Sequence, residues 1–400
     1  MYRLSHTLPD PEPVPAKICL WTPDLFSNTG GIQTFSGHFL KALTTNIPSA
    51  AIRVIVKNDL RDAVCNNNGF NHISGCGDWW LPFRTPYFAS ECLREAWRES
   101  PTLIISTHLN FGPLAQLSRK LTGVPYILIA HGIDVWQLDN HRRESALREA
   151  DLVLAVSRYT RDQLVHRLGV ELQNIELLPN TFSPDRFRQG PKSPRLLHKY
   201  GFESHTPVVL TVSRLAGAER YKGYDQMIKA MPQILREIPD ARYLLVGAGP
   251  DCPRIERLTT DMGVRNAVVL AGFVADEELA EHYNLCDLFA MPSKGEGFGI
   301  VYLEALACGK PVLAGNKDGS TDALNDGELG LLVDPDNIDE IASETIRVLR
   351  REHSHPNLFQ PELLRKRVTE LFGFETFKQT VAERLKRFLD GRTNRHRICH

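Results

Sequence analysis

The chain has 400 residues, of which 42% are hydrophobic and 24% are charged, and its formal net charge is −1. These values are typical of a globular protein with two or three domains, and near neutrality gives no reason to expect a nucleic acid partner or general attraction to acidic membranes. The eight cysteines form no C-x-x-C pair and no zinc-like spacing with histidine, so we expect no metal site and a reducing, cytoplasmic setting.

The amino-terminal residues 1–16 are predicted to form a flexible tail. Prolines at positions 9, 11, 13 and 15 interrupt this segment where a signal peptide would need an apolar run. No stretch of the sequence approaches the roughly 18 to 20 consecutive apolar residues needed to cross a bilayer. We therefore expect neither a signal peptide nor a membrane span.

Short apolar runs then alternate with segments of helical length, which is typical of parallel sheets covered by helices. We predict a Rossmann-like domain over residues 17–182. Its strands are predicted at Lys17–Trp21, Ile52–Lys57, Leu103–Thr107, Tyr126–Ala130, Leu152–Val156 and Ile175–Leu178.

An insertion within this domain, Cys65–Trp97, carries several aromatic residues among glycine and proline. Aromatic side chains in a loop can stack on sugar faces or meet a lipid, but they more often form a local core under the loop. The sequence leaves these alternatives open. The residues are Trp79, Trp80, Phe83, Tyr87 and Phe88.

Residues 183–205 are rich in proline, arginine and glycine and lack periodicity, so they are predicted to be a linker. A second Rossmann-like domain is predicted over residues 206–360. Two doubly wound α/β domains would face each other across a cleft, where ligands of such folds bind. The strands of the second domain are predicted at Val208–Val212, Tyr243–Val246, Val268–Ala271, Leu288–Met291, Val312–Ala314 and Leu331–Val333.

Helical spacing of apolar residues over 361–390 predicts helices that pack back across both domains. Residues 391–400 are predicted to be a basic tail. Contact of this basic segment with an anionic membrane surface is one interpretation, and a solvated helix face with a frayed end is the other.

Glu304 is the most informative residue, because its helix is apolar or small at nearly every other position. A carboxylate buried there costs several kcal/mol unless a partner, here expected to be a ligand, hydrogen-bonds it. Glu296 precedes it in the glycine-rich loop Lys294–Gly299, whose free N–H groups at a helix start would bind an anion. A helix starting near Gly297 would separate the two carboxylates by up to about 12 Å. The alternative is an ordinary strand-to-helix turn with a glutamate that reaches solvent.

Two cations complete the predicted anion site. Arg214 follows a strand and Lys222 precedes Gly223 and a helix, so both could converge on a diphosphate without a metal. Other phosphate motifs fail: Gly247-Ala-Gly249 lacks the third glycine of a dinucleotide fingerprint, since Cys252 stands there, and Gly309-Lys310 is followed by proline rather than serine or threonine.

These motifs, together with Gly30-Gly31-Ile32 and His131-Gly132, resemble the retaining glycosyltransferases of family 4, which have the GT-B fold. The family includes glycogen synthase-like and mannosyltransferase-like members of the "glycosyl transferases group 1" type. The resemblance runs from about residue 17 to residue 390. The motifs of the second domain are specific as a set, whereas a Gly-Gly pair alone is weak.

The resemblance implies a donor nucleotide-diphosphate sugar of the UDP or GDP class. Glu304 would bind the ribose hydroxyls, Glu296 would face the donor sugar, and Arg214 and Lys222 would hold the diphosphate. Gly31 would let the backbone approach the phosphates, and His131 would lie beside the donor sugar. The catalytic group would comprise His131, Glu296, Arg214 and Lys222, the donor site would add Gly31, Gly297, Phe298, Gly299, Ile300 and Glu304, and the acceptor side would include Gly30, Ile32 and Asp134.

The implied reaction is glycosyl transfer with retention and without a metal or other cofactor. The acceptor stays open among a soluble sugar, a growing polysaccharide and a lipid-linked sugar. A nucleotide-sugar epimerase of the same architecture and a non-catalytic nucleotide-sugar-binding subunit are the alternatives. The chain departs from the usual family pattern at Asn180-Thr181, where Asn-Gly is common, and at Asp318–Asp322, where Gly-Gly and then Glu are frequent.

Overall fold

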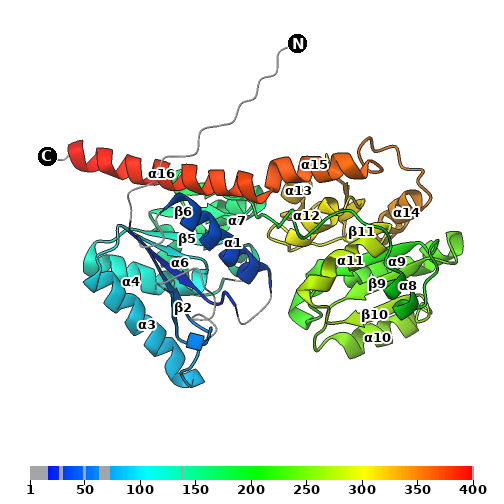
Figure 1. Ribbon diagram of the computed structural model, residues 1–400, viewed down its shortest axis with the longest axis horizontal. Helices are drawn as coiled ribbons and strands as arrows, with labels where there is room; N and C mark the ends of the chain where they lie inside the picture. The colour runs from blue at the N-terminus through cyan, green and yellow to red at the C-terminus, as the bar shows by residue number, and fades with distance from the viewer. Residues whose placement is uncertain (1–16, 27–29, 48–50, 63–72, 137, 399–400) are drawn as a thin grey trace, which may run out of the picture. The chain divides into compact units, whose positions relative to one another are not determined.

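The computed structural model describes residues 17–26, 30–47, 51–62, 73–136 and 138–398, with side chains as far as Gly391. The predicted tail 1–16 lies outside the described residues, as do the first part of the aromatic insertion and the end of the basic tail. The chain divides into two compact units (Figure 1). The first comprises residues up to 155, 163–178 and 375 onward, and the second comprises 156–162 and 179–374.

The first unit is built on a parallel sheet in the order β3-β2-β1-β4-β5-β6-β7. Its central strands are buried on both faces, which is why they read as continuous apolar runs in the sequence. The strands are β1 (Ile18–Thr22), β2 (Ile52–Val56), β3 (Ile73–Gly75), β4 (Leu103–Ser106), β5 (Tyr126–Ala130), β6 (Leu152–Ala155) and β7 (Ile175–Leu177).

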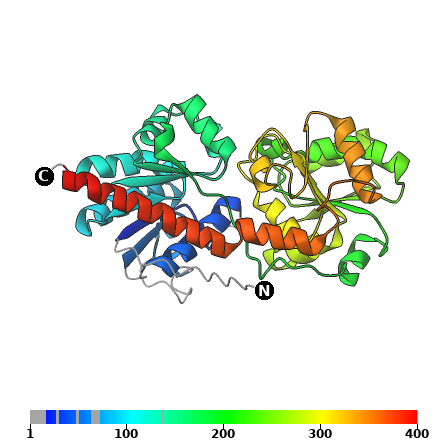
Figure 2. The ribbon, with the colours of Figure 1, turned by 90° about the horizontal axis from the view of Figure 1, so that it is seen from above.

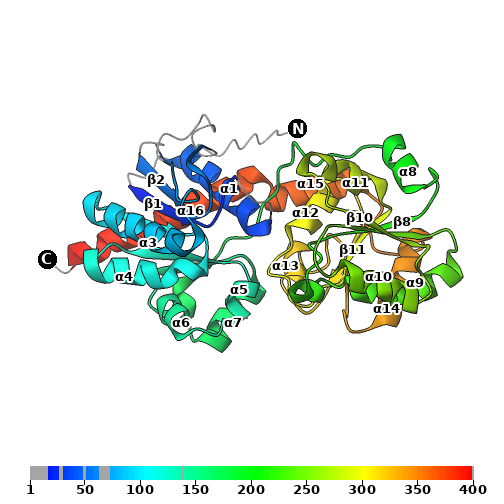
Figure 3. The ribbon, with the colours of Figure 1, turned by 90° about the horizontal axis from the view of Figure 1, so that it is seen from below.

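Helices cover both faces of this sheet. Figure 2 shows the red helix α16 (Phe374–Ile398) above one face, and Figure 3 shows α3 (Leu81–Arg98) and α4 (Gly112–Thr122) on the other. Helix α16 packs on α1 (Gly31–Asn46), where the rings of Phe35 and Phe377 meet edge to face with centroids 5.7 Å apart. This unit also carries α5 (Ile133–Trp136) and α6 (His141–Arg148), and α7 (Arg158–Leu168) is divided between the two units at Gln163.

The second unit repeats the architecture with a parallel sheet in the order β10-β9-β8-β11-β12-β13. The strand order reverses between β8 and β11, and ligands of doubly wound folds bind at the carboxyl ends of the strands at this point. Its strands are β8 (Val208–Val212), β9 (Arg242–Val246), β10 (Val268–Gly272), β11 (Leu288–Met291), β12 (Val312–Gly315) and β13 (Leu331–Val333). Its helices are α8 (Pro194–Tyr200), α9 (Tyr224–Glu237), α10 (Cys252–Asp261), α11 (Leu279–Leu285), α12 (Ile300–Ala307), α13 (Ser320–Ala323), α14 (Ile338–Leu349) and α15 (Pro361–Phe372).

The predicted α/β fold class is confirmed, and every predicted strand is present within one residue at each end. Strand β3 was not predicted, because its sequence Ile73-Ser-Gly75 contains a single apolar residue. The segment 183–205, predicted as a linker, belongs to the second unit and carries α8, whose Leu196 is buried. Of the two C-terminal helices, α15 belongs to the second unit and almost all of α16 to the first.

The aromatic insertion is helical from Leu81 onward, so the prediction of a loop was wrong there. Phe88, Cys92 and Ala96 recur at four-residue spacing and are buried against the sheet, which explains the helix. Phe88 is therefore a core residue, whereas Trp80 and Phe83 at the amino end of α3 are exposed.

Candidate functional site

The conformation of the glycine-rich loop between β11 and α12 depends on where α12 begins. Helix α12 begins at Ile300 rather than near Gly297, so Glu296 lies in the loop and the predicted helical separation from Glu304 does not apply. Gly299 caps the helix with φ +91°, and a Cβ there would lie 2.3 Å from the ring of Tyr302. Only glycine fits this position.

A buried carboxylate, Asp318, holds the beginning of this loop. Its Oδ2 accepts hydrogen bonds from the amides of Gly295 (2.8 Å) and Glu296 (2.7 Å) and from the Ser293 hydroxyl (2.7 Å). Its Oδ1 accepts from the amide and the hydroxyl of Ser320, at 3.0 and 2.6 Å. Burial raises the pKa of Asp318, and the hydrogen bonds from Ser320 and the Glu296 amide oppose that rise.

The loop therefore offers fewer free N–H groups than the sequence predicted. The amides of Gly295 and Glu296 are occupied by Asp318, a residue that the sequence analysis set apart as a departure from the family pattern. In the part of the chain that the structure describes, the amides of Gly297, Phe298 and Gly299 have no hydrogen-bond partner. The Phe298 ring is buried against Phe372, with centroids 5.4 Å apart, so this residue can offer its amide but not its ring.

The two predicted cations lie at the carboxyl end of β8 and are joined by a carboxylate that sequence reasoning missed. Arg214 Nη2 lies 2.5 Å from Glu219 Oε1, and Lys222 Nζ lies 3.7 Å from Glu219 Oε2. Lys222 Nζ also lies 3.4 Å from Glu296 Oε2, so the structure places Lys222 beside Glu296 and links Arg214 to Lys222 through Glu219. The one signal for Glu219 was its position three residues before Lys222, because residues three apart align in a 3₁₀ turn.

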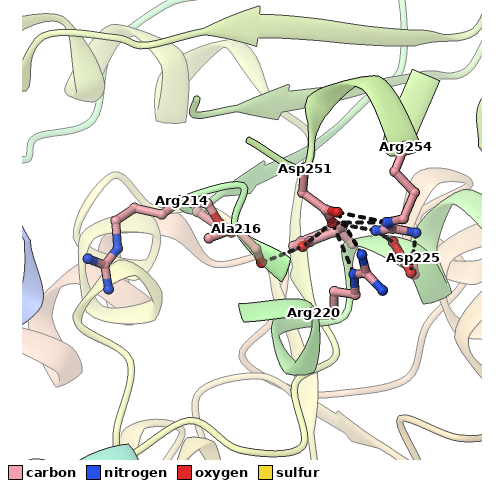
Figure 4. Close-up of polar contacts among 8 residues, drawn as sticks. Arg214, Ala216, Arg220, Asp225, Asp251 and Arg254 are labelled. Carbon is pink, nitrogen blue, oxygen red and sulfur yellow. Dashed lines mark hydrogen bonds and ion pairs between the residues drawn. The ribbon is translucent and has the colours of Figure 1, made fainter. Parts of the chain in front are cut away.

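A second charged network lies behind this turn (Figure 4). Asp251 accepts hydrogen bonds from the guanidinium groups of Arg220 and Arg254 and from the Tyr224 hydroxyl, and Arg254 also binds Asp225. Arg254, followed by Arg220, holds the pKa of Asp251 well below its usual range. Figure 4 shows Arg214 extending away from this network. The network holds Arg220, which belongs to the turn, and does not include Arg214.

The two glycines of Gly247-Ala-Gly249 pack closely against the backbone next to Arg214. A Cβ at Gly247 would lie 1.8 Å from the carbonyl oxygen of Ser213, and one at Gly249 would lie 2.0 Å from that of Leu215. Both glycines thus let the loop after β9 pack directly against the backbone on either side of Arg214. Close packing is therefore a structural reason for glycine at both positions.

Glu304 is buried on α12 and does not reach solvent freely, at 9% exposure. The Tyr283 hydroxyl donates a 2.6 Å hydrogen bond to its Oε2, so the partner predicted to be a ligand is in part a protein side chain. Burial raises the pKa of Glu304 to about 7, and the Tyr283 hydrogen bond and the nearby Arg186 oppose the rise. No hydrogen bond from a described residue reaches Oε1, and the role of Glu304 in binding ribose hydroxyls stays a prediction.

In the first unit, Gly30, Gly31 and Ile32 lie at the amino end of α1. A Cβ at Gly31 would meet nothing within 4 Å, so packing within this protein does not explain the glycine. An open position is what the expected backbone approach to phosphate requires.

His131 follows β5 and is held by the protein on several sides. Its Nε2 lies 2.8 Å from the Thr107 carbonyl oxygen, and its ring packs edge to face on Phe35 at 4.8 Å. Burial lowers its pKa to about 4, so the imidazole is neutral near pH 7. The backbone oxygen of Thr107 makes Nε2 the protonated nitrogen, which leaves Nδ1 as an acceptor.

Asp134 stabilises this turn, since its Oδ1 accepts from the His131 amide at 3.0 Å. Burial raises the pKa of Asp134 to about 7, and backbone amides oppose that rise. Its Oδ2 is buried without a hydrogen-bond partner in the described structure. The role of Asp134 on the acceptor side stays a prediction.

Comparison with protein families gives matches over both halves of the chain. Residues 36–186 match the family described as Glycosyltransferase Family 4, and residues 193–360 match the family described as Glycosyl transferases group 1.

Similar curated proteins include two mannosyltransferases. The GDP-mannose-dependent alpha-(1-6)-phosphatidylinositol monomannoside mannosyltransferase of Mycolicibacterium smegmatis is 36% identical over 242 residues, which are 58% of this chain and 62% of that protein. The GDP-mannose-dependent monoacylated alpha-(1-6)-phosphatidylinositol monomannoside mannosyltransferase of Corynebacterium glutamicum is 29% identical over 349 residues, which are 83% of this chain and 88% of that protein. The chain spans less than two thirds of the length of the mycobacterial relatives it matches, at 62% to 64%.

Solved structures show the same fold. Anabaena HepE in complex with UDP and glucose has a TM-score of 0.77 at 20% identity, covering 93% of this chain and 99% of that one. Sucrose-phosphate synthase from Thermosynechococcus elongatus has a TM-score of 0.74 at 21% identity, covering 95% of this chain and 100% of that one. With both family matches and this fold, the chain belongs to the GT-B glycosyltransferases of family 4 and of the glycosyl transferases group 1 type.

Proposed function

We propose that this protein is a retaining, metal-independent glycosyltransferase that moves a hexose from a nucleotide-diphosphate sugar to a carbohydrate or lipid-linked carbohydrate acceptor. The observation that carries the proposal is the position of the Lys222 ammonium, 3.4 Å from Glu296 at the start of the loop whose next three amides have no partner in the described structure. Two cations and a row of amides suit a diphosphate, and the carboxylate suits sugar hydroxyls.

GDP-mannose is the donor that the relatives favour. The mycobacterial and corynebacterial proteins are named as GDP-mannose-dependent and act on phosphatidylinositol monomannosides. HepE, with a similar fold, binds UDP and glucose, so UDP sugars are the second class to test. An acceptor with a lipid anchor would bring the protein to the cytoplasmic face of a membrane as a peripheral enzyme. No helix in the described part of the chain combines the length and the apolar run that crossing a bilayer requires.

Catalysis would come from stabilising the leaving diphosphate. The bond between the sugar C1 and the diphosphate oxygen breaks, and the negative charge that develops is held by Arg214, Lys222 and the amides of Gly297–Gly299. The acceptor hydroxyl attacks C1 from the same face, and its proton passes to the departing phosphate oxygen. No protein carboxylate need form a bond to the sugar.

Glu296 would orient the donor sugar. Its Oε2 is buried and has no hydrogen-bond partner in the described residues, and a sugar hydroxyl would supply the missing donor. His131, neutral with Nδ1 free to accept, would contact a hydroxyl of the same sugar. A neutral imidazole neither repels nor attracts the diphosphate.

Thermal unfolding with and without ligand tests the proposal, because a ligand that binds only the folded state raises Tm. GDP, UDP, GDP-mannose and UDP-glucose are compared on the wild type, Glu304→Ala and Lys222→Ala. We expect GDP-mannose to raise the wild-type Tm, Glu304→Ala to abolish the shift and Lys222→Ala to reduce it. Lys229→Ala, an exposed lysine on α9, is the matched control and should keep the full shift. Equal shifts in all variants would contradict the assigned site.

Turnover separates the enzyme from its alternatives. Release of GDP from GDP-mannose that depends on an added mannoside or phosphatidylinositol mannoside acceptor supports glycosyl transfer. Conversion of the donor without acceptor would indicate an epimerase, and binding without any turnover across an acceptor panel would indicate a non-catalytic subunit.

A further inference from the structure

Glu219 lies between the two cations that would hold the diphosphate. It is buried at 7% exposure in the 3₁₀ turn Gly217–Lys222, with one oxygen 2.5 Å from Arg214 Nη2 and the other 3.7 Å from Lys222 Nζ. Lys222 also faces Glu296 at 3.4 Å. Two formal positive charges are thus matched by two formal negative charges at the place where an anionic ligand is expected.

The contacts of Lys222 are loose. Its distances to both carboxylates exceed those of a normal charged hydrogen bond, and Glu219 Oε2 and Glu296 Oε2 are each buried without a hydrogen-bond partner in the described structure. Asp251, which directly precedes α10, differs, because Arg220 and Arg254 donate to it at 2.8 and 2.6 Å. The Asp251 network is closed, whereas the Glu219 cluster can exchange partners.

We propose that Glu219 is an internal counter-ion that competes with the diphosphate for Arg214 and Lys222. Without ligand it balances the two cations, which would otherwise repel each other in a partly buried site. With the nucleoside diphosphate product bound, its negative charge weakens the grip on the product and promotes release. This inference rests on the proposed function, because it assigns the ligand of the cations to the donor diphosphate.

A purely structural role for Glu219 predicts the opposite effect on diphosphate binding. If the Glu219 carboxylate only positions Arg214 and Lys222, it strengthens diphosphate binding. Removing this carboxylate would then weaken diphosphate binding. The sign of the change on neutralising Glu219 therefore decides between the two roles. Repulsion between the Glu219 carboxylate and a diphosphate a few ångströms away in a partly buried site can change the affinity for the diphosphate about tenfold, which is about 1.4 kcal/mol.

The test is calorimetric titration of the full-length protein with GDP and UDP, comparing the wild type with Glu219→Gln. We expect Glu219→Gln to bind the nucleoside diphosphate about tenfold more tightly and the corresponding monophosphate as the wild type does. In turnover assays the inhibition constant of the product should fall by the same factor. Glu256→Gln, an exposed glutamate of α10, removes the same charge elsewhere and should leave both constants unchanged.

The outcomes separate the two proposals. If neither GDP nor UDP binds the wild type, the proposed function fails and this inference fails with it. If the wild type binds and Glu219→Gln binds equally or more weakly, the counter-ion role alone is overturned. Should Glu219→Gln unfold at the assay temperature, Glu219→Met, which also removes the charge at similar volume, is titrated in its place and judged by the same sign.

Discussion

The hydroxyl of Tyr283, on α11, donates a 2.6 Å hydrogen bond to the carboxylate of Glu304, on α12, and both residues are buried. The bond reaches across 21 positions of the sequence to the residue expected to bind ribose. It satisfies Oε2 and so orients the carboxylate with Oε1 left for a ligand. If Glu304 binds the ribose as proposed, Tyr283 is a positioning residue for the donor nucleotide.

Removing this hydroxyl should weaken nucleotide binding without removing the carboxylate. We expect Tyr283→Phe to raise the Kd of the donor about tenfold, because Glu304 loses its fixed orientation and a hydrogen bond that favours its ionised form. Isothermal titration with the best nucleotide sugar measures the change. Tyr200→Phe, which removes a hydroxyl bonded to His282 in the same unit, is the control and should leave the Kd unchanged. A similar loss in both variants would mean that the effect is general destabilisation.

Glu304 also predicts a pH dependence. Its pKa is raised from 4.5 to about 7 in the folded protein, so between these values the folded state binds more protons than the unfolded state. The contribution of Glu304 to the free energy of unfolding should therefore fall as pH rises from about 4.5 to 7 and level off above, by an amount of order 3 kcal/mol. Urea unfolding of the wild type and of Glu304→Gln at several pH values measures this contribution as the difference between the two profiles, because Asp134 and His131, whose pKa values are also shifted, titrate in both proteins.

Ligand binding should show the opposite trend with pH. Ribose hydroxyls donate to a carboxylate, so ionisation of Glu304 favours the nucleotide, and affinity should rise as pH increases from 6 to 8. In Glu304→Gln this rise should disappear. A rise that persists in the variant would place the titrating group elsewhere.

The hydrogen bonds of Asp318 indicate that replacing its carboxylate with an amide should destabilise the loop that it holds. Replacing Asp318 with asparagine leaves one oxygen to accept the hydrogen bonds that two now share, so either the amides of Gly295 and Glu296 or the amide of Ser320 lose their acceptor. We expect Asp318→Asn to destabilise the protein by about 3 kcal/mol and to lower donor affinity as well. Asp334→Asn, which breaks a surface ion pair with Lys317, should cost less than about 1 kcal/mol. Equal effects in urea unfolding would contradict the role of Asp318 in holding the loop.

Much of the fold could be predicted because buried parallel strands leave an unambiguous pattern. Tyr126–Ala130 and Leu288–Met291 are apolar at every position, and the structure has strands at those same residues. The exceptions have physical causes. Strand β3 has only one apolar residue, Ile73, and the tryptophans and prolines near the start of α3 obscured the four-residue spacing of Phe88, Cys92 and Ala96.

The candidate site was predictable only in part. Arg214, Lys222, Glu296 and Glu304 could be found because each stands at a strand exit or inside a recognisable motif. The residues that hold them could not, because their roles depend on contacts between distant segments. Asp318 accepts a hydrogen bond from the Glu296 amide across 22 positions of the sequence. The residues next to Asp318 and Tyr283 in the sequence do not indicate which distant residue either one contacts.

Two glycines offer a matched pair that separates stability from function. Gly299 has φ +91° and the Tyr302 ring stands where a Cβ would be, so Gly299→Ala should destabilise the protein by about 2 kcal/mol or more. Gly31 begins α1 with open space around it, so Gly31→Ala should leave Tm unchanged or slightly higher, since alanine favours the helix. If Gly31 faces the phosphates or the acceptor, this stable variant should nevertheless lose most of its kcat/KM. Full activity in Gly31→Ala would remove Gly31 from the site, and an unchanged Tm in Gly299→Ala would contradict the geometry of the loop.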